Sequence, residues 1–99
     1  MDGIFVANDQ MALGLLQAAS QSGLDVPKDL AVVGFDGIPE SAYYWPPLTT
    51  MYHDLGELGS RAVRELVEIV EARHDGDRRI EPRAVSLHPE LIVRASSVC

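Results

Sequence analysis

Two apolar runs in the first half of the chain each end in a polar residue, and a helical pattern separates them. The strand expected over residues 2–7, apolar from Ile4 to Ala7, is followed by Asn8, and the run over residues 30–35 is followed by Asp36. Runs that are apolar throughout are typical of parallel strands covered on both faces. Between the runs, apolar residues recur at helical spacing over residues 10–22. The pattern therefore predicts a right-handed crossover of strand, helix and strand.

The second half of the chain begins irregularly and then becomes helical. The proline pair Pro46-Pro47 disfavours a regular strand or helix interior. Asp54 and Glu57 have the spacing of a capping box, which marks the start of a long helix. The expected elements are a strand over 48–52, a helix from Asp54 to a turn at 75–77, and short strands over 84–88 and 91–94. Together they predict an α/β fold, a parallel sheet with flanking helices.

Composition limits the partners that this stretch can have. A net charge of −7 and only 8 Lys and Arg among 99 residues give no general attraction to nucleic-acid phosphates. One cysteine, Cys99, excludes an internal disulfide framework and fits a reducing compartment. No apolar run reaches the length of a membrane span, and no export signal follows Met1. We expect a cytoplasmic protein that does not enter a membrane and does not bind DNA through this stretch.

Asn8 and Asp36 are the candidate functional residues. Parallel strands bring their carboxyl ends to one edge of the sheet, where α/β proteins bind ligands. A carboxylate accepts hydrogen bonds from adjacent hydroxyls and an amide both donates and accepts, so the pair suits a sugar or another polyol. The residues by themselves also allow a structural interpretation, in which Asn8 caps a helix and Asp36 begins a turn. Asp9, immediately before the predicted helix, is assigned the role of its cap.

Catalytic and metal-binding patterns are not found in the sequence. There is no nucleophile elbow and no phosphate-binding glycine loop, and Cys99 lies at the chain end. The histidines His53, His74 and His88 are far apart and lack helical pairing, which argues against a metal site. We expect neither an enzyme nor a cofactor.

Several motifs, taken together and in order, resemble the effector-binding core of LacI/GalR-family bacterial transcription repressors. They are Gly3 to Gly14 with Ala7-Asn8-Asp9 at its centre, Val26-Pro27, Val32-Val33-Gly34-Phe35-Asp36, Pro46-Pro47-Leu48-Thr49-Thr50, Leu58-Gly59 and Pro89-Glu90-Leu91. The resemblance implies a partial type I periplasmic-binding-protein-like fold, which is Rossmann-like. It corresponds to the carboxyl-terminal part of such a repressor, with residues 1–48 and about 89–99 in one lobe and about 53–85 in the other.

The resemblance also implies which residues bind the effector. Asn8 and Asp36 match family residues that hydrogen-bond it, His53 matches a polar residue that closes over it, and Leu55 matches an apolar residue that packs on it. The sequence departs from the family pattern at Gly37, often an aspartate, and at His53, often a glutamine. Gly37 removes a charge near the site, and His53 affects which ligand is bound.

Surfaces for a second copy are implied as well. Leu13, Leu16 and Tyr44 correspond to segments through which family members dimerise, so a homodimer is expected. The long helix carries an apolar stripe that includes Leu58 and Leu66. Because exposed stripes of that size tend to become buried, we predict that a second copy covers it or that it collapses onto the sheet.

The implied function is that of an effector-binding part of a transcriptional repressor. The effector is a carbohydrate or nucleoside-like molecule, and DNA is bound by a helix-turn-helix headpiece outside this stretch. The alternative is a periplasmic sugar-binding protein of a transport system, which shares the fold.

Overall fold

The computed structural model describes residues 2–76 and 84–98. The chain divides into two compact units, one formed by Met1–His53 with Pro89–Cys99 and the other by Asp54–His88. Whether these units correspond to the two lobes implied by the family resemblance stays a prediction.

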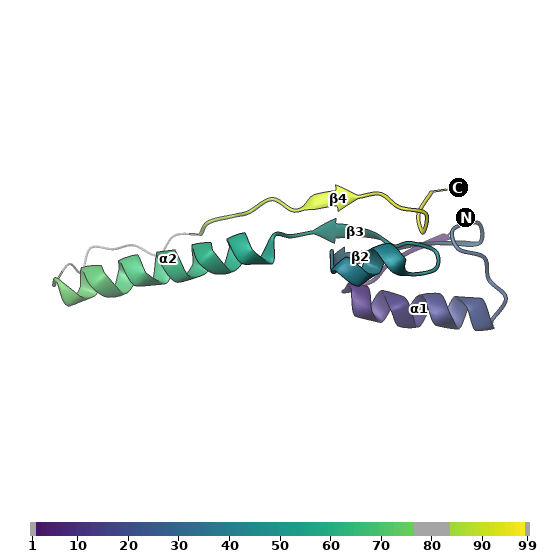
Figure 1. The fold of residues 1–99 in the computed structure, drawn as a ribbon, viewed down its shortest axis with the longest axis horizontal. Coiled ribbons are helices and arrows are strands. Elements are labelled where there is room, and N and C mark those ends of the chain that lie inside the picture. Colours follow the sequence, from purple (N-terminus) through teal and green to yellow (C-terminus); the bar gives the residue numbers. More distant parts are fainter. Residues whose placement is uncertain (1, 77–83, 99) are drawn as a thin grey trace. The chain divides into compact units, whose positions relative to one another are not determined.

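The first unit is built on a sheet of four strands in the order β1-β2-β3-β4 (Figure 1). Strands β1 (Asp2–Phe5), β2 (Leu30–Asp36) and β3 (Thr49–Tyr52) are parallel, and β4 (Glu90–Ile92) runs antiparallel to β3. Helix α1 (Asp9–Gln21) connects β1 to β2 and packs on one face of the sheet. The predicted α/β fold is confirmed, with three of the four strands parallel and α1 against one face of the sheet.

The Asn8 side chain caps the start of helix α1, where the first backbone amides lack partners within the helix. Asn8 has extended backbone angles, and its Oδ1 accepts a hydrogen bond of 2.8 Å from the Met11 amide, as an N-cap residue does. The assignment of Asp9 as the cap is therefore wrong. Asp9 is the first helical residue, and its side chain is fully buried.

The core of the first unit lies between α1 and the sheet. Alternate residues of a strand point to opposite faces, so β2 turns Val32 toward the helix while its neighbours face away. Ala12 and Leu16 of α1 pack against it, and Leu48 closes the core with no exposed surface. The six buried members of the cluster are Val6, Ala12, Leu16, Val32, Tyr44 and Leu48.

A short segment near the carboxyl end is fastened to β2 and β3 by buried side chains. The Ser96 hydroxyl donates to the Val32 carbonyl at 2.6 Å and accepts from the Thr49 amide at 2.8 Å. Arg94 Nη1 donates to Ser41 Oγ at 2.8 Å and to the Leu48 carbonyl at 2.9 Å. These bonds join residues 46 to 64 positions apart and attach the segment to β2, to β3 and to the loop between them.

Several elements differ from the prediction. β1 ends at Phe5 and all four of its residues are exposed, because it is an edge strand and α1 covers only one face. Residues 84–88 do not form the predicted strand, and β4 occupies Glu90–Ile92 in place of 91–94. The irregular segment after β2 contains a short 3-10 helix, η1 (Pro39–Tyr43), which begins at a proline.

The second unit contains helix α2 (Leu55–His74), which starts as predicted. Asp54 Oδ1 accepts a hydrogen bond of 2.9 Å from the Glu57 amide, which caps the first turn. The helix is followed by Asp75 and by Gly76 at a positive φ of 82°. Of the predicted turn, Asp77 lies outside the described residues.

Neither face of α2 is buried. Leu55, Val63 and Leu66 are each about 60% exposed, and no residue of the helix counts as buried. Arg61 Nε lies 3.4 Å from Glu65 Oε1, and these two residues line a small pocket together with Leu58, Ala62, Val85 and Leu87. The side of α2 that carries Arg61 and Glu65 is therefore partly covered, together with Leu58, whereas Leu55, Val63 and Leu66 are covered by none of the described residues.

Candidate functional site

The carboxyl ends of β2 and β3 lie level with each other at one edge of the sheet. Asp36, the last residue of β2, is paired in register with Tyr52, the last residue of β3. Asp36 is half-buried, and its carboxylate has no hydrogen-bond partner among the described residues. An acceptor group of this kind at this edge of a parallel sheet is available to a ligand.

The backbone bends sharply directly after β2. Asp36 has a φ of 119° and Gly37 a φ of 72°. Residues other than glycine rarely adopt a positive φ, and such strain often accompanies functional sites. A Cβ on Gly37 would lie 2.7 Å from Tyr52 Cα, so only glycine fits there. The departure from the aspartate common in the family at this position therefore has a steric reason in this chain.

A closed ring of hydrogen bonds holds this bend. Asp9 Oδ2 accepts from the Ile38 amide at 2.9 Å, and Asp9 Oδ1 accepts from the Thr50 hydroxyl at 2.6 Å. The Thr50 oxygen in turn accepts from the Gly37 amide at 3.3 Å. Residues from the start of α1, from β3 and from the loop after β2 thus meet at one buried carboxylate.

Asn8 is placed at the same edge but is already engaged in part. It follows β1, which pairs with β2, and its neighbour Asp9 is bonded to the loop after Asp36. Its Oδ1 caps α1, whereas its amide nitrogen donates to none of the described residues. Asn8 can therefore cap the helix and also contact a ligand, because capping occupies only its side-chain oxygen and leaves its two N–H groups without a partner among the described residues.

His53 follows β3 and lies against the end of β2. Its ring centroid is 4.7 Å from that of Phe35, in an edge-to-face arrangement. Phe35 also contacts Phe5, the last residue of β1, with centroids 6.3 Å apart. The three rings form a row across the carboxyl ends of the strands, on the sheet face that α1 does not cover, because Phe35 alternates with Gly34 and Asp36.

Leu55 does not belong to the unit that forms this edge. It is the first residue of α2 in the second unit and is 63% exposed. Its role in ligand binding stays a prediction.

The three residues expected at a dimer surface differ in exposure. Leu13 is 48% exposed on α1, whereas Leu16 and Tyr44 are buried in the core of the first unit. Burial, together with the nearby carboxylates of Asp9 and Glu40, raises the pKa of the Tyr44 hydroxyl. Next to Tyr44 in the chain, Tyr43 and Trp45 are 87% and 90% exposed.

Sequence reasoning missed Asp9 and Thr50. An aspartate at a strand-to-helix junction has the pattern of a cap, and a threonine in a strand has an ordinary β propensity. Their 2.6 Å contact joins positions 41 apart in the sequence. The sequence contained no local signal that could have found it.

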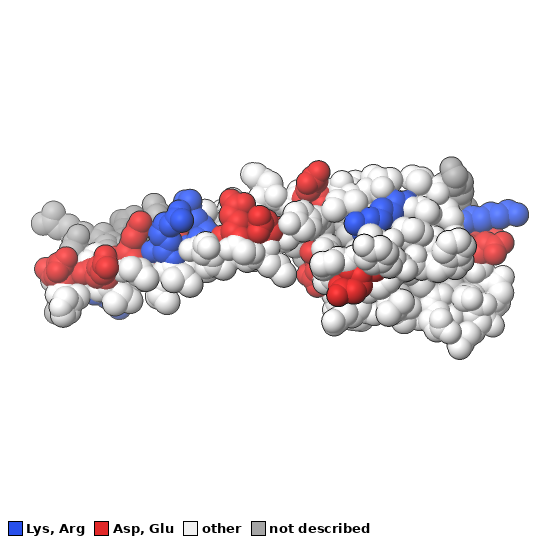
Figure 2. All heavy atoms as spheres, in the orientation of Figure 1, with Lys and Arg blue, Asp and Glu red and all other residues white. Residues whose placement is uncertain are grey.

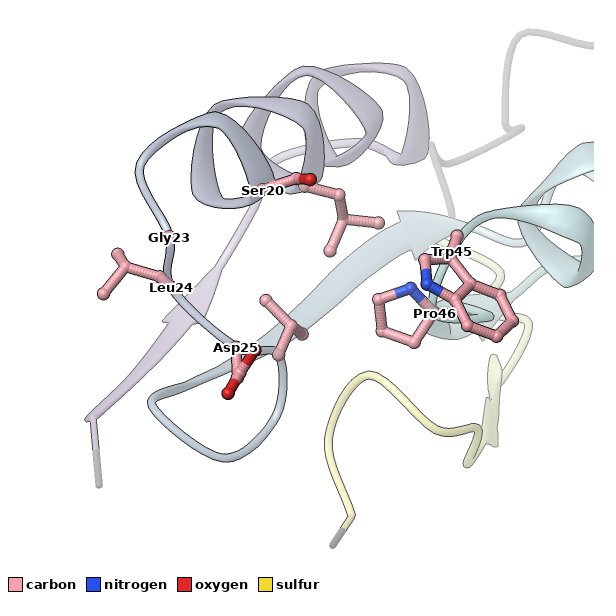
Figure 3. A pocket seen from close by; sticks show the side chains of 8 residues that line it. Ser20, Gly23, Leu24, Asp25, Trp45 and Pro46 are labelled. Carbon is pink, nitrogen blue, oxygen red and sulfur yellow. The ribbon is translucent and has the colours of Figure 1, made fainter.

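A pocket of about 210 Å³ lies away from this edge, at the carboxyl-terminal half of α1 (Figure 3). Ser20 and Leu24 line one side and Trp45 and Pro46 the other. It is open to solvent, and none of the residues that the sequence selected for ligand binding lines it. The candidate site therefore remains the strand edge.

Among the described residues no group of three or more potential metal ligands occurs. On the face drawn in Figure 2, basic and acidic side chains are interspersed and form no continuous basic patch. None of the described helices has the length and apolarity needed to cross a membrane.

Curated relatives of the chain are repressors of DNA transcription. It is 40% identical over 93 residues to the HTH-type transcriptional repressor PurR of Pasteurella multocida, which corresponds to 94% of this chain and 26% of the relative. The PurR repressor of Aliivibrio salmonicida is 39% identical over 93 residues, with the same coverage. The chain thus spans about a quarter of the length of these relatives.

Solved structures give the same result. A lac repressor dimer bound to operator and the anti-inducer ONPF matches with a TM-score of 0.80 and 36% identity, over 98% of this chain and 32% of that one. A LacI-family regulator from Arthrobacter sp. FB24 in complex with lactose matches with a TM-score of 0.78 and 40% identity, over 98% and 35%. A ribose-bound regulator from Enterococcus faecium matches with a TM-score of 0.80 and 27% identity, over 96% and 34%.

The family model for the periplasmic binding protein-like domain matches residues 2–97. This range includes both units and every element described above. The chain therefore belongs to the periplasmic binding protein-like domain family, in the branch that contains the LacI-family transcriptional regulators.

Proposed function

We propose that this chain forms part of the effector-binding domain of a bacterial transcriptional repressor, and that Asp36 binds the effector. The observation that carries the proposal is the Asp36 carboxylate, which ends β2 at the ligand edge without a partner among the described residues. The repressor relatives and the sugar-bound neighbours support it.

The effector is proposed to be a carbohydrate or a nucleoside-like molecule. Asp36 accepts hydrogen bonds from two ligand hydroxyls, and the free N–H groups of Asn8 donate to a ligand oxygen. The ring of His53, held against Phe35, presents either a donor or an acceptor. Leu55 contributes an apolar contact when the domain closes.

Effector binding is proposed to act on DNA through a conformational equilibrium. A ligand that contacts both lobes binds more tightly to the state in which they are correctly placed, and so shifts the population toward it. DNA itself is bound by a helix-turn-helix outside this chain, because the chain's net charge of −7 does not favour contact with phosphates. A repressor acts where the chromosome is, so we infer a cytoplasmic location.

The test is the substitution Asp36→Asn in the full-length protein, assayed by calorimetry with a panel of saccharides and nucleosides that includes ribose and lactose. Asparagine tolerates a positive φ as aspartate does, so the backbone is preserved and only the charge is removed. A hydrogen bond to a charged group contributes about 1.5–3 kcal/mol, so we expect affinity to fall by about tenfold or more.

Asp2→Asn is the matched control. Asp2 begins β1 at the opposite edge of the same sheet and is exposed, so its substitution should leave affinity unchanged. An equal loss in both variants, or no loss with Asp36→Asn, would remove Asp36 from the binding site.

A homodimer is part of the proposal. Leu13 offers exposed apolar surface on α1, and Tyr43 and Trp45, on either side of Tyr44 in the chain, are exposed as well. Leu16 and Tyr44, which the resemblance also implies, would act from beneath this surface by supporting its shape, since both are buried.

Transport remains the second candidate, because a periplasmic sugar-binding protein has the same fold. The curated relatives described above are repressors, and this favours regulation. An upstream coding sequence with a signal peptide would favour transport, whereas a helix-turn-helix would exclude it.

A further inference from the structure

We propose that Asp9 is a positioning residue of the effector site, which acts through Thr50 and the loop after β2 on the placement of Asp36. This inference rests on the proposed function, since it concerns the same site. Asp9 is the most deeply buried acidic residue that the structure describes. It does not cap α1, and it is not among the residues proposed to contact the ligand.

Asp9 is buried, and burying a carboxylate without hydrogen-bond partners costs free energy. Its exposed fraction is 0%, and a buried carboxylate is retained only when hydrogen bonds replace its water. Both oxygens are satisfied, Oδ1 by the Thr50 hydroxyl and Oδ2 by the Ile38 amide. The chain packs tightly around it, because a Cβ on Gly34 would overlap Asp9 Oδ1 and lie 2.8 Å from Leu48 Cδ2.

The ring determines the path of the backbone directly after Asp36. Two consecutive amides, those of Gly37 and Ile38, are held by Thr50 and Asp9 respectively. Asp36, the last residue of β2, and Gly37 both have positive φ, so the two amides that the ring holds come directly after the strained backbone of Asp36. Release of the two amides allows the bend to relax toward ordinary angles, which rotates the Asp36 carboxylate away from its position at the edge.

The ring also joins the elements that border the site. Asp9 is the first residue of α1 and follows Asn8, while Thr50 lies two residues before Tyr52, the register partner of Asp36. One carboxylate thus sets the spacing between the ends of β1, β2 and β3. Preorganisation of this kind increases affinity because the ligand does not have to order the site.

The experiment compares Thr50→Val with Thr50→Ser in the full-length protein. Valine keeps the shape of threonine and removes the hydroxyl, whereas serine keeps the hydroxyl. With ribose as the first probe, or the member of the saccharide and nucleoside panel that binds most tightly, Thr50→Val should weaken binding about tenfold, the lower end of what the loss of a supporting hydrogen bond costs behind metal ligands. Thr50→Ser should remain near the parent affinity.

Two further measurements separate positioning from stability. Amide hydrogen exchange at Gly37 and Ile38 should accelerate in Thr50→Val and not in Thr50→Ser. This measurement is made without ligand. Ser96→Ala is the control for stability, because it removes buried hydrogen bonds to Val32 and Thr49 without touching the bend. It should lower the unfolding temperature and leave affinity unchanged.

The double variant Thr50→Val with Asp36→Asn tests the route of the effect. If Thr50 acts through Asp36, its substitution costs little affinity once the carboxylate is gone, so the two losses are not additive. If Thr50→Val does not fold, Asp9→Asn, which keeps the shape of Asp9, takes its place in every comparison.

The outcomes are distinct. Full affinity in folded Thr50→Val, additive losses, or a loss of affinity in Ser96→Ala equal to that in Thr50→Val overturns the positioning role while leaving the site itself in place. Unchanged affinity in Asp36→Asn alone overturns the proposed function as well.

Discussion

At the bend after β2, the backbone can lie against Tyr52 only because Gly37 has no side chain. Gly37 combines a positive φ with a Cβ position only 2.7 Å from a backbone atom, so both the conformation and the space require glycine. Gly14, within α1, has no atom within 4 Å of its Cβ position and no such requirement. Two glycines in the same small unit therefore respond in opposite ways to the same substitution.

We predict that Gly37→Ala destabilises the protein and that Gly14→Ala stabilises it. A non-glycine residue in a strained conformation costs about 1–3 kcal/mol, and the overlap with Tyr52 adds to that cost. In a helix interior, alanine is better than glycine by about 0.5–1 kcal/mol. Urea denaturation of the two variants measures both changes. A Gly37→Ala protein as stable as the parent would contradict the described bend.

Asp9 and Asn8 show how two neighbouring residues share the tasks at one junction. Each has a short side chain that ends in an oxygen able to accept a hydrogen bond from a backbone amide, so either could cap a helix. The structure gives the cap to Asn8 and buries Asp9 completely. The difference follows from what surrounds the second position, where Thr50 and Ile38 supply two donors.

At the scale of elements, η1 and the segment after it are attached to the sheet through one aromatic side chain and one cation. Tyr44 is buried in the core cluster, while Arg94 bonds to Ser41 of η1 and to the Leu48 carbonyl. The exposed residues on both sides of Tyr44 thus depend on it for their position. Ionisation of its hydroxyl should therefore weaken the whole segment.

We predict that stability falls at alkaline pH in a way that depends on Tyr44. Its pKa is raised from the ordinary value of 10.0, chiefly by burial and then by the charges of Asp9 and Glu40. As pH rises through about 10, the unfolded chain therefore releases this proton before the folded chain does, and the free energy of unfolding declines. Chemical denaturation at a series of alkaline pH values should show a shallower decline for Tyr44→Phe than for the parent.

Tyr43→Phe is the control for this titration. Tyr43 is 87% exposed and adjacent in the chain, so its substitution should leave the alkaline decline as it is in the parent. Identical declines in all three proteins would mean that Tyr44 does not titrate differently in the folded and unfolded states.

At the scale of the whole molecule, the chain consists of one unit with a buried core and a second unit in which none of the described residues is buried. The first unit buries an apolar cluster between α1 and the sheet. The second contains a helix of 20 residues, none of them buried, whose apolar face includes Leu55, Val63, Leu66 and Val70. An amphipathic helix gains most of its stability from packing, so this face requires a covering surface.

We predict that the chain by itself associates through the apolar face of α2. Sedimentation equilibrium at micromolar concentration should give a mass above that of one chain, because burial of several leucine and valine side chains contributes about 1.5–3 kcal/mol each. Leu66→Glu should reduce the mass toward the monomer. Arg64→Glu, on the opposite side of the helix, should not. A monomeric parent protein would contradict the prediction.

Much of the fold could be predicted because its signals are local. The buried strand ending at Asp36, the start of α2 at Asp54 and the helical pattern of α1 all depend on residues close in sequence. The prediction of a strand over 84–88 was wrong. Val85 and Leu87 line a pocket beside α2, and residues 84–88 pair with none of the described strands. A strand forms only where a partner edge is available, and alternation along the chain cannot supply that partner.

The sequence by itself determined the order of strands and helices, the family to which they are similar, and the presence of Asp36 at the end of a buried strand. Those features follow from periodicity and from motifs within short windows. Only the tertiary structure decided that Asn8 caps the helix while Asp9 holds the bend, that Gly37 is required by Tyr52, and that Leu16 and Tyr44 are core residues. Each of these depends on contacts between residues far apart in the chain, which exist only after the strands have paired and α1 has packed on the sheet.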